Sequence, residues 1–407
     1  METGVDNCRL KGLDTPLASG PKTNHVAHCQ SDGYCPLSVN HHVTSASRPQ
    51  TGTRSGRKLV LHMDVRNTIL VADSVDKVSV EQALNSFLTG VTWGRDTEAD
   101  WEWYSERPSL RRPHPNTITY YKHLENRLVG IPSDRVLLRR VTGDFTQEDI
   151  GRKFVTYFEK HLKHLEWPHL EDPDPYLTMK GKDGKLYHYI LPSFYRLIEH
   201  LHQNKRDFSI VIRTYGLDAP NVLQSMTRTL EGQHPDFPHS LRITIDPSPG
   251  KIIRGQDDIT AQISNDQDPR SGPSTYRGDR DIYDLMSNSS GVSAFVDDFR
   301  HWQANGYRSS AGKPLWIDPE RTDVQHIFFD DNIRVTEADS IVDVRMFDSP
   351  NSDVARSLSR QEALTFEDMC LVQADLLQSI SNKDYFINEV EACERKFDDY
   401  IRTTGKR

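Results

Sequence analysis

The run KLVLHM at residues 58–63 is followed directly by DVRNT at 64–68, and this junction predicts the fold. An apolar run without alternation is typical of a parallel strand that is covered on both faces. Two further runs of this kind are SIVI at 209–212 and HIFF at 326–329. Each run ends in polar residues, and segments with helical periodicity lie between the runs. The sequence therefore predicts an α/β protein with a doubly wound, mostly parallel sheet.

Oxygen-bearing side chains follow the three predicted strands. Asp64 follows the first run, Thr214 the second, and the pair Asp330 and Asp331 the third. In a doubly wound sheet, ligands bind beyond the carboxyl ends of the strands, so we expect these side chains to share one crevice. A carboxylate pair after a buried strand is repulsive without a cation, and carboxylate oxygens suit Mg²⁺. The sequence predicts a Mg²⁺ site in which the ion reduces repulsion between Asp64 and an incoming anion.

Four blocks in this order resemble the haloacid dehalogenase-like (HAD) hydrolases, whose fold is a Rossmann-like α/β core with helical caps. In LVLHMDVRNTI, the resemblance maps the nucleophile and a metal ligand to Asp64, and a loop-fixing hydroxyl to Thr68. In SIVIRTYG, it maps the phosphate-binding hydroxyl to Thr214. These two blocks imply a phosphatase that acts through an aspartyl-phosphate.

The other two blocks supply the cation and the acidic pair. AGKP matches the block whose lysine neutralises nucleophile and phosphate, which maps this role to Lys313. HIFFDDN matches the metal-binding pair, which maps it to Asp330 and Asp331. Lys313 precedes Asp330 by 17 residues, and this separation predicts a helix between the two blocks.

The same residues make chemical sense without the family. A carboxylate such as Asp64 can attack a phosphoryl centre and divide hydrolysis into two steps. Thr214, together with the backbone amides of Tyr215 and Gly216 at a predicted helix start, could hold phosphate oxygens. Lys313 would oppose the growing negative charge.

Arg66 is the main departure from the family pattern. HAD phosphatases usually carry a second Asp two positions after the nucleophile, which protonates the leaving group, and here Arg66 stands at that position. A guanidinium stays protonated and cannot act as this acid. Loss of a general acid typically lowers the rate by about 100-fold to 10,000-fold. The backbone carbonyl of Arg66 remains a potential metal ligand, as in the family, and its side chain could hold a second anionic group.

Three functions follow from these residues. The favoured function is a Mg²⁺-dependent phosphatase acting on a small phosphorylated substrate. The alternative, prompted by Arg66, is a catalytically weakened HAD-like protein that binds phosphate or a partner as a regulator or scaffold. Carbon–halogen hydrolysis by Asp64 is the third, and it needs no metal, so it leaves the acidic pair without a role.

Two rival assignments stay open at this point. Lys251 in PGK competes with Lys313 as the site lysine. Asp297 and Asp298 form a second acidic pair, but an aromatic periodic stretch follows them, which is more typical of a helix start.

Composition and periodicity divide the chain into three parts. Residues 1–57 are rich in Ser, Thr, Gly, Pro and His and predict a disordered tail. Residues 58–350 predict the core, with two insertions at about 90–190 and about 245–292. The second insertion is loop-like and poor in apolar residues. Residues 351–407 predict a helical segment. The resemblance implies that the insertions act as caps that screen substrates.

Local signals predict several helices and one further strand. Ser79 and Gln82 form a capping box for a helix that ends at Gly90, and Ser193 is expected to cap another helix. LRITID at 241–246 predicts a strand. Amphipathic helices are expected at EALTFEDMCLVQADLLQSI and YFINEVEACERKFDDYI.

Charge and cysteine content limit the partners of the 407-residue chain. There are 50 Lys and Arg against 59 Asp and Glu, so a net charge of −9 argues against nucleic acid and membrane as partners. No apolar run reaches the ~20 residues of a membrane span, which predicts a cytoplasmic protein. Five cysteines give no disulfide framework. The sequence leaves the oligomeric state open.

The first part of the chain also contains potential zinc ligands. Their spacing does not match that of a paired zinc knuckle: His25, His28, Cys29, Cys35, His41 and His42.

Overall fold

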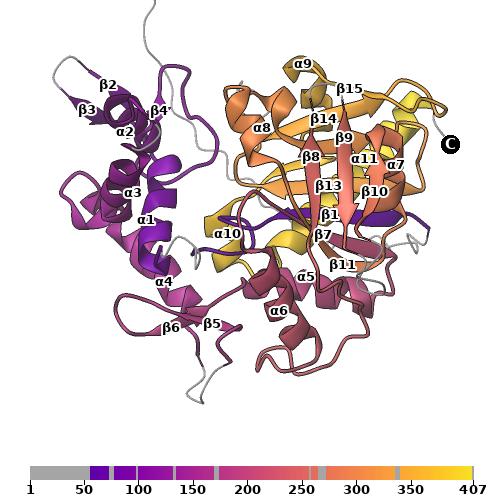
Figure 1. The fold of residues 1–407 in the computed structure, drawn as a ribbon. Helices are drawn as coiled ribbons and strands as arrows, with labels where there is room; N and C mark the ends of the chain where they lie inside the picture. The colour runs from indigo at the N-terminus through magenta and orange to yellow at the C-terminus, as the bar shows by residue number, and fades with distance from the viewer. Residues whose placement is uncertain are drawn as a thin grey trace, which may run out of the picture. The chain divides into compact units, whose positions relative to one another are not determined.

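An eight-stranded sheet holds the three predicted strands side by side (Figure 1). β1 (Lys58–Asp64) lies between β7 (Phe208–Thr214) and β13 (Val324–Asp330) and pairs in parallel with both. β11 (Gly291–Val296) extends the parallel sheet beyond β7, and β16 (Leu371–Gln373) extends it beyond β13. Almost every residue of β1, β7 and β13 is buried. The predicted α/β class with a mostly parallel sheet is confirmed.

This structure is a computed structural model, and it describes most of the chain from residue 56 onward. The described ranges are 56–72, 78–97, 100–131, 134–168, 174–255, 258–264, 272–334 and 340–405. The predicted tail at 1–57, with its histidines and cysteines, therefore lies outside the described residues except for its last two positions.

The remaining strands of the large sheet come from the segment predicted to be a loop-like insertion. β8 (Gly250–Arg254) pairs in parallel with β11, β9 (Ile259–Ile263) pairs with β8 in the antiparallel direction, and β10 (Ser274–Arg277) follows as the antiparallel edge strand. α7 (Gly278–Ser287) packs against β9 and β10. The prediction of a loop at about 245–292 was wrong. In β8 and β9, buried residues alternate with more exposed ones, so a strand forms with few apolar residues.

The segment LRITID does not form the strand that was predicted. It runs as extended chain and makes one isolated bridge, between Ile245 and Val292. The amide of Val292 donates to the Thr244 carbonyl, and the amide of Asp246 donates to the Val292 carbonyl. Gly291, at φ 72°, brings the two chains so close that a side chain there would meet the Thr244 backbone. The contact with β11 is therefore confined to this point.

Helices cover the large sheet and share one apolar cluster with it. α5 (Pro192–Gln203) and α6 (Ala219–Leu230) contribute buried apolar residues, and Pro220 lies in the first turn of α6 as predicted. Ser193 does not cap α5, because Leu191 takes the N-cap position and Pro192 is the first helical residue. The hydroxyl of Ser193 instead donates to the carbonyl of Ser379 at 2.6 Å.

The insertion after β1 contains helices, as predicted, and it packs around a second apolar cluster, to which Leu376 and Leu377 of α10 (Leu376–Ser381) also contribute. α1 (Val80–Gly90) begins with the predicted capping box and ends at Gly90, and its apolar face belongs to this cluster. The ring of Trp103 lies against Phe145 and Phe154, so this tryptophan packs the insertion. The other elements of this part are α2 (Tyr120–Leu128), α3 (Arg135–Gly143), α4 (Val155–Leu165), β2 (Trp93–Asp96), β3 (Trp101–Trp103), β4 (Ile118–Thr119), β5 (Thr178–Lys180) and β6 (Leu186–His188).

Lys313 begins a strand of a separate three-stranded sheet. β12 (Lys313–Ile317) pairs in parallel with β14 (Val342–Phe347), and β15 (Ala355–Ser357) completes this sheet. The predicted helix between Lys313 and Asp330 was wrong. All five residues of β12 are buried, so this segment is a strand, and the turn between β12 and β13 is too short for a helix.

The segment 362–380 is not one amphipathic helix. It contains α9 (Arg360–Ala363) in part, then β16, then α10 (Leu376–Ser381). Strand pairing outweighs helical periodicity here, because Leu371 and Val372 are buried beside Phe328 and Phe329. The two cysteines among the described residues, Cys370 and Cys393, are buried free thiols.

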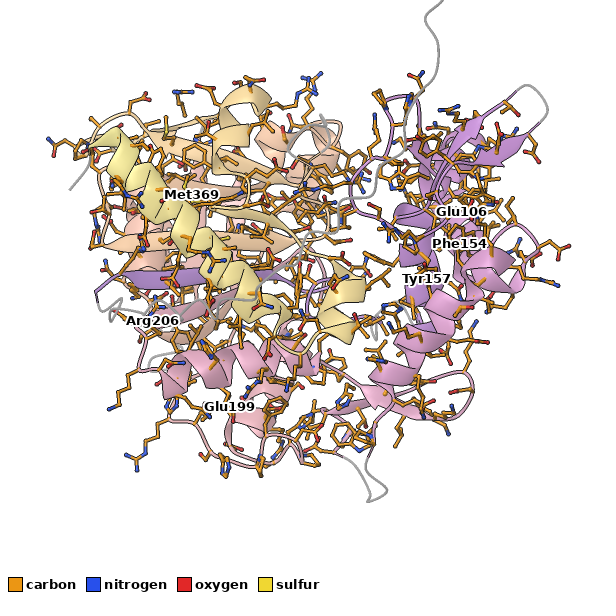
Figure 2. All side chains as sticks on the ribbon, turned by 180° about the vertical axis from the view of Figure 1, so that it is seen from behind. Glu106, Phe154, Tyr157, Glu199, Arg206 and Met369 are labelled. Carbon is orange, nitrogen blue, oxygen red and sulfur yellow. The ribbon has the colours of Figure 1, made fainter. Side chains whose placement is uncertain are left out.

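The last predicted helix is confirmed as α11 (Tyr385–Thr404), and Figure 2 shows it lying across one face of the sheet. Phe386, Val390 and Phe397 are buried on its apolar face. Arg206 holds Glu394 of this helix through two hydrogen bonds, at 2.7 and 3.1 Å. Within the described ranges, the structure contains no helix of the length and apolarity that a membrane crossing requires.

We predict that Phe386→Ala lowers the free energy of unfolding by about 3–5 kcal/mol. Phe386 is fully buried, and its ring contacts those of Phe194 and Phe329, so truncation leaves a cavity between α11, α5 and β13. Urea denaturation measures the loss. Arg395→Ala on the same helix is the control, because Arg395 is exposed, and it should change stability by no more than about 0.5 kcal/mol. Equal effects of the two substitutions would contradict this packing.

Candidate functional site

A lysine and three carboxylates meet at the carboxyl edge of the large sheet. The Nζ atom of Lys313 donates to Asp64 Oδ1 at 2.5 Å and to Asp330 Oδ2 at 2.8 Å. One oxygen each of Asp64, Asp330 and Asp331 lies within 4.8 Å of the others. The structure therefore brings together the first, third and fourth of the four sequence blocks, which are up to 267 residues apart.

Strand register explains why these side chains meet. β1 and β13 run in parallel with Met63 opposite Phe329, and the next residues along the two strands are Asp64 and Asp330. Lys313 reaches them from the start of β12, and its Nζ atom also contacts the Arg213 carbonyl at 3.3 Å. Parallel strands end at the same edge of a sheet, so two carboxylates and their counter-ion converge there.

The loop after β1 supports the carboxylates. The hydroxyl of Thr68 contacts Asp64 Oδ2 at 3.4 Å, as expected for a loop-fixing group. Asn67 has φ 57°, a conformation that asparagine tolerates better than most residues, and its side-chain amide donates to Asp331 Oδ2 at 3.1 Å. Asn67 was not among the predicted site residues. Asn67 follows Asp64 by three residues in the same loop, and this proximity was the only sign in the sequence that it could belong to the site.

Burial and mutual repulsion shift the protonation of these groups. Burial first, and then the nearby Asp330 carboxylate, raise the pKa of Asp64 from its usual 3.8 to about 7, although Lys313 opposes this shift. The pKa of Asp331 is raised well above its usual value by burial and by Asp330 and Asp64. Burial alone would lower the pKa of Lys313, but the carboxylates outweigh it and raise that pKa. One lysine therefore does not neutralise the cluster.

The donor set fits a hard divalent cation. Three carboxylates with one ammonium carry an excess of negative charge when all are ionised, and carboxylate oxygens are the ligands that Mg²⁺ and Ca²⁺ take. Lys313 contacts one oxygen each of Asp64 and Asp330. The backbone amide of Asn332 donates to Asp330 Oδ1 at 2.9 Å, and the Asn332 side chain donates to Asp331 Oδ1 at 2.9 Å. An ion would therefore bind through further lone pairs of these carboxylates or in place of some of these contacts.

The loop after β7 carries the predicted phosphate-binding residues. Thr214 is buried at the end of β7, and its hydroxyl accepts a hydrogen bond from the Gly216 amide at 2.9 Å. The Gly216 amide is thus engaged inside the loop, and it orients Thr214 instead of pointing at a ligand as was expected. A Cβ atom at Gly216 would lie 2.6 Å from Asp218 Oδ2, so a larger residue there would displace the Asp218 carboxylate.

Arg66 extends toward this same loop. Its Nε atom lies 3.5 Å from Asp218 Oδ2, and its side chain is 39% exposed, whereas that of Asp218 is fully buried. A cation therefore occupies the position at which the resemblance expects an acid, and a buried carboxylate holds it. The exposed part of the guanidinium can contact an anion.

An aromatic group beside Lys313 was not predicted from the sequence. Lys313 Nζ lies 5.1 Å from the ring centre of Tyr215, and this ring stacks on Trp302 at 5.2 Å. Phe299 contacts both rings and is 41% exposed. The Tyr215 hydroxyl is buried without a hydrogen-bond partner within the described part of the chain. Aromatic periodicity in FRHWQANGY was visible in the sequence, but its proximity to Lys313 depends on the tertiary structure.

The rival residues lie elsewhere or have other partners. Lys251 is an exposed residue of β8, so Lys313 is the lysine at the carboxylates. Asp298 caps α8 (Phe299–Ala304) by accepting from the His301 amide, as predicted for a helix start. Asp297 forms a buried two-bond ion pair with Arg213, at 2.6 and 2.9 Å. Neither Asp297 nor Asp298 belongs to the three-carboxylate group.

Comparison with known proteins adds no assignment to this geometry. No protein-family model matches the chain, and neither a curated protein nor a solved structure matches it.

We predict that the thermal stability of the metal-free protein falls as pH rises from about 4 to about 7. In this range the folded chain retains a proton on Asp64 that the unfolded chain has lost, so the unfolded state gains relative stability as pH rises. Magnesium should reverse the effect, because the ion competes with protons for the carboxylates. At a concentration 100 times its dissociation constant, it should add about 2.7 kcal/mol of stability.

Thermal unfolding at about pH 5 and about pH 8, with chelator or with Mg²⁺, measures this linkage. Asp331→Asn should raise the stability at the higher pH in chelator and remove most of the response to Mg²⁺, because one repelling carboxylate is gone. Asp323→Asn, at an exposed ion pair with Arg321, is the matched control. A Mg²⁺ response that is equal at both pH values, or equal in both variants, would rule out these carboxylates as the binding site.

Proposed function

We propose that the protein is a Mg²⁺-dependent phosphatase of the HAD type that acts on a small phosphorylated substrate. One observation carries the proposal: Lys313 Nζ bridges Asp64 and Asp330 at the carboxyl ends of two adjacent parallel strands, with Asp331 beside them. The family resemblance implies residues with these roles, and their convergence requires three separate segments of the chain to meet.

The sheet topology supports the same proposal. The chain goes from β1 to β7 and β11 on one side, and then to β13 and β16 on the other, so the strand order reverses at β1. This is the doubly wound pattern, and ligands bind at such a reversal. The carboxylates lie at the end of β1 and β13, which is where this rule places a ligand.

Asp64 is the nucleophile in this proposal. Lys313 holds Asp64 Oδ1, so in this proposal Oδ2 is the oxygen that would attack phosphorus, and Oδ1 is the one that would face the ion. The new Asp64–phosphorus bond forms as the bond from phosphorus to the leaving oxygen breaks, and water then hydrolyses the aspartyl-phosphate to inorganic phosphate. Lys313 and the Thr214 hydroxyl stabilise the phosphoryl oxygens. Bound Mg²⁺ supplies positive charge that lowers the repulsion between carboxylate and phosphate.

Arg66 restricts the substrates that fit. With no acid at that position, the leaving oxygen departs without a proton from this side chain, which favours a leaving group of low pKa. The exposed guanidinium also favours a second anionic group on the substrate. The helical insertion after β1 would act as the cap that selects such compounds.

A second function is favoured by the same residue. Arg66 lies beside the Thr214 loop and Asp218, where it would strengthen phosphate binding without supplying a proton. A catalytically weakened protein that binds phosphate as a regulator or scaffold therefore remains the alternative. Hydrolysis of an aryl phosphate separates the two, because its leaving group needs no acid.

We predict Mg²⁺-dependent release of nitrophenol from p-nitrophenyl phosphate by the purified full-length chain. Asp64→Asn should lower kcat by at least about 1,000-fold, because the attacking oxygen is lost. Asp323→Asn serves again as the surface control and should retain full activity. A wild-type chain that binds Mg²⁺ and phosphate without turnover would exclude the phosphatase and leave the binding function.

We also predict that Arg66→Asp raises kcat for an alkyl phosphate by about 100-fold to 10,000-fold. The new carboxyl group would stand where the resemblance expects the general acid, and an alkyl leaving group depends on it. Arg66→Asn is the matched control, since it removes the cation without adding an acid. The gain should be far smaller for an aryl phosphate, and equal gains for both substrates or both variants would argue against an acid role.

A further inference from the structure

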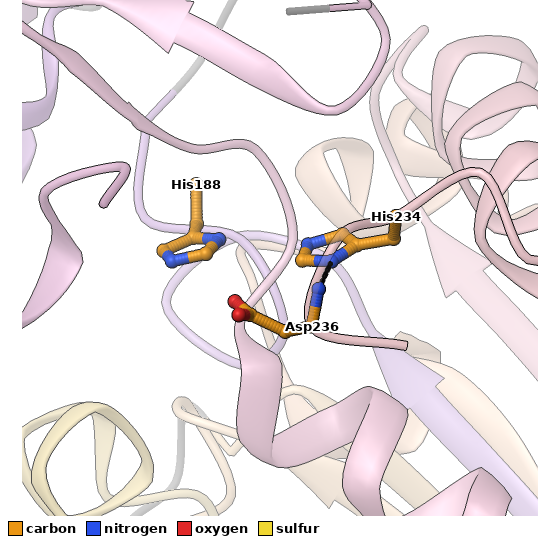
Figure 3. A group of neighbouring side chains, drawn as sticks. All are labelled: His188, His234 and Asp236. Atoms are coloured by element: carbon orange, nitrogen blue, oxygen red, sulfur yellow. Dashed lines mark hydrogen bonds between the residues drawn. The ribbon is translucent and has the colours of Figure 1, made fainter. Parts of the chain in front are cut away.

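Two histidines and an aspartate form a second group of potential metal ligands, separate from the three carboxylates (Figure 3). His188 is the last residue of β6, and His234 and Asp236 lie in the loop after α6. One ligand atom from each residue lies within 4.8 Å of the other two. Figure 3 shows the two imidazole rings side by side, with the Asp236 carboxylate next to the space between them.

The two imidazoles are buried and held in a fixed orientation. His188 is 6% exposed and His234 is 1% exposed, and their rings are nearly parallel, with an angle of 5° and centres 5.6 Å apart. The Trp167 ring contacts both edge-on, at 4.9 and 5.0 Å. Tyr195 and Phe237 also lie against His234. Asp236, in contrast to the two histidines, is exposed.

The loop that carries His234 and Asp236 is shaped by its own backbone. Gly232 has φ 81°, and a side chain there would collide with the Pro238 carbonyl. The amide of Phe237 donates to the His234 carbonyl at 2.9 Å, and the amide of Leu241 donates to the Leu230 carbonyl at 2.8 Å. The ligand positions therefore do not require an ion to bring them together.

We propose that His188, His234 and Asp236 bind a divalent transition-metal ion of the Zn²⁺ type. Two imidazole nitrogens and one carboxylate oxygen form a three-ligand set, and zinc takes such sets with a further position open to water. Imidazole nitrogen disfavours Mg²⁺, so this site and the three-carboxylate site select different ions. Aromatic packing alone accounts for buried histidines, but it does not require a carboxylate to converge on their nitrogens.

Binding has one local cost. The Asp236 amide donates to His234 Nδ1 at 3.1 Å, which leaves the ring proton on Nε2. An ion bound through Nε2 requires the tautomer with the proton on Nδ1, so the bond from the Asp236 amide is lost, at a cost of about 1 kcal/mol. Coordination to two histidines and a carboxylate exceeds this by a wide margin. The bound ion would fasten β6, at the end of the helical insertion, to the loop after α6.

Cobalt titration of the chelator-treated full-length chain in excess Mg²⁺ tests the proposal. Excess Mg²⁺ competes with Co²⁺ for carboxylate ligands, and four- or five-coordinate Co²⁺ absorbs visible light far more strongly than octahedral Co²⁺ in water. The wild-type chain should bind Co²⁺, and Zn²⁺ should displace it. Asp236→Asn should weaken this binding by at least about 10-fold to 100-fold, since loss of even an indirect partner of a metal site costs that much. His25, His28 and other residues of the first 55 are the same in all variants, so the difference isolates the site.

Glu231→Gln is the matched control, because it removes the same charge from an exposed position of the same loop. It should bind Co²⁺ as the wild-type chain does. Zn²⁺ should also raise the thermal midpoint of the wild-type chain and of Glu231→Gln, but not of Asp236→Asn, and circular dichroism checks that all three fold alike. Equal Co²⁺ affinity in the two variants would overturn the proposal. Because phosphatase activity is not measured, failure here is independent of the function proposed for Asp64.

Discussion

The balance of charge around Lys313 is the constraint on which the carboxyl edge of the sheet depends. Its ammonium group is the cation that the structure places between Asp64 and Asp330, and Asp331 adds a third carboxylate to the same buried space. One positive charge cannot offset three negative charges at low dielectric, so the cluster must bind protons or a metal ion. The raised pKa of Asp64 and the proposed affinity for a divalent cation both follow from the same excess of negative charge.

Packing and buried polar contacts together hold that lysine in place. Lys313 lies on a sheet different from that of Asp64, and Arg213 links the two, because its guanidinium donates to the Pro314 carbonyl while its own carbonyl accepts from Lys313. Asp297 pairs with this arginine through both of its oxygens, and His62 contacts it on the other side. A buried charge is tolerated when its hydrogen bonds are satisfied. Arg213 meets this condition, and its bond to the Pro314 carbonyl holds β12 in place beside β7.

The proposed metal sites differ in chemistry, and this difference separates their roles. The site at Asp64 offers only carboxylate oxygens and lies where a doubly wound sheet binds ligands. The site at His188 offers nitrogen, lies among aromatic rings and joins two parts of the chain that meet away from the sheet edge. The first is suited to phosphate chemistry with a hard cation, and the second to a transition metal that stabilises the junction. In the proposed phosphatase, Arg66 stands where a general acid was expected, and this limits the catalysis proposed for the first site.

The sequence by itself determined the three buried strands and the polar residues at their ends, Asp64 and Asp330 among them, because apolar runs are visible in the sequence. Lys313 was expected only from the family resemblance, and Lys251 stayed a rival until the structure placed Lys313 at the carboxylates. The sequence did not indicate β8 and β9, because buried residues only alternate with more exposed ones in these strands, so few apolar residues are needed. It did not indicate the strand at Leu371 either, because that segment has helical periodicity and forms a strand only through pairing with β13. Only the tertiary structure decided which residues from distant parts of the sequence lie next to each other. It placed Tyr215 against Lys313, and it brought His188 together with residues 46 and 48 positions further along the chain, because such contacts depend on how distant segments pack.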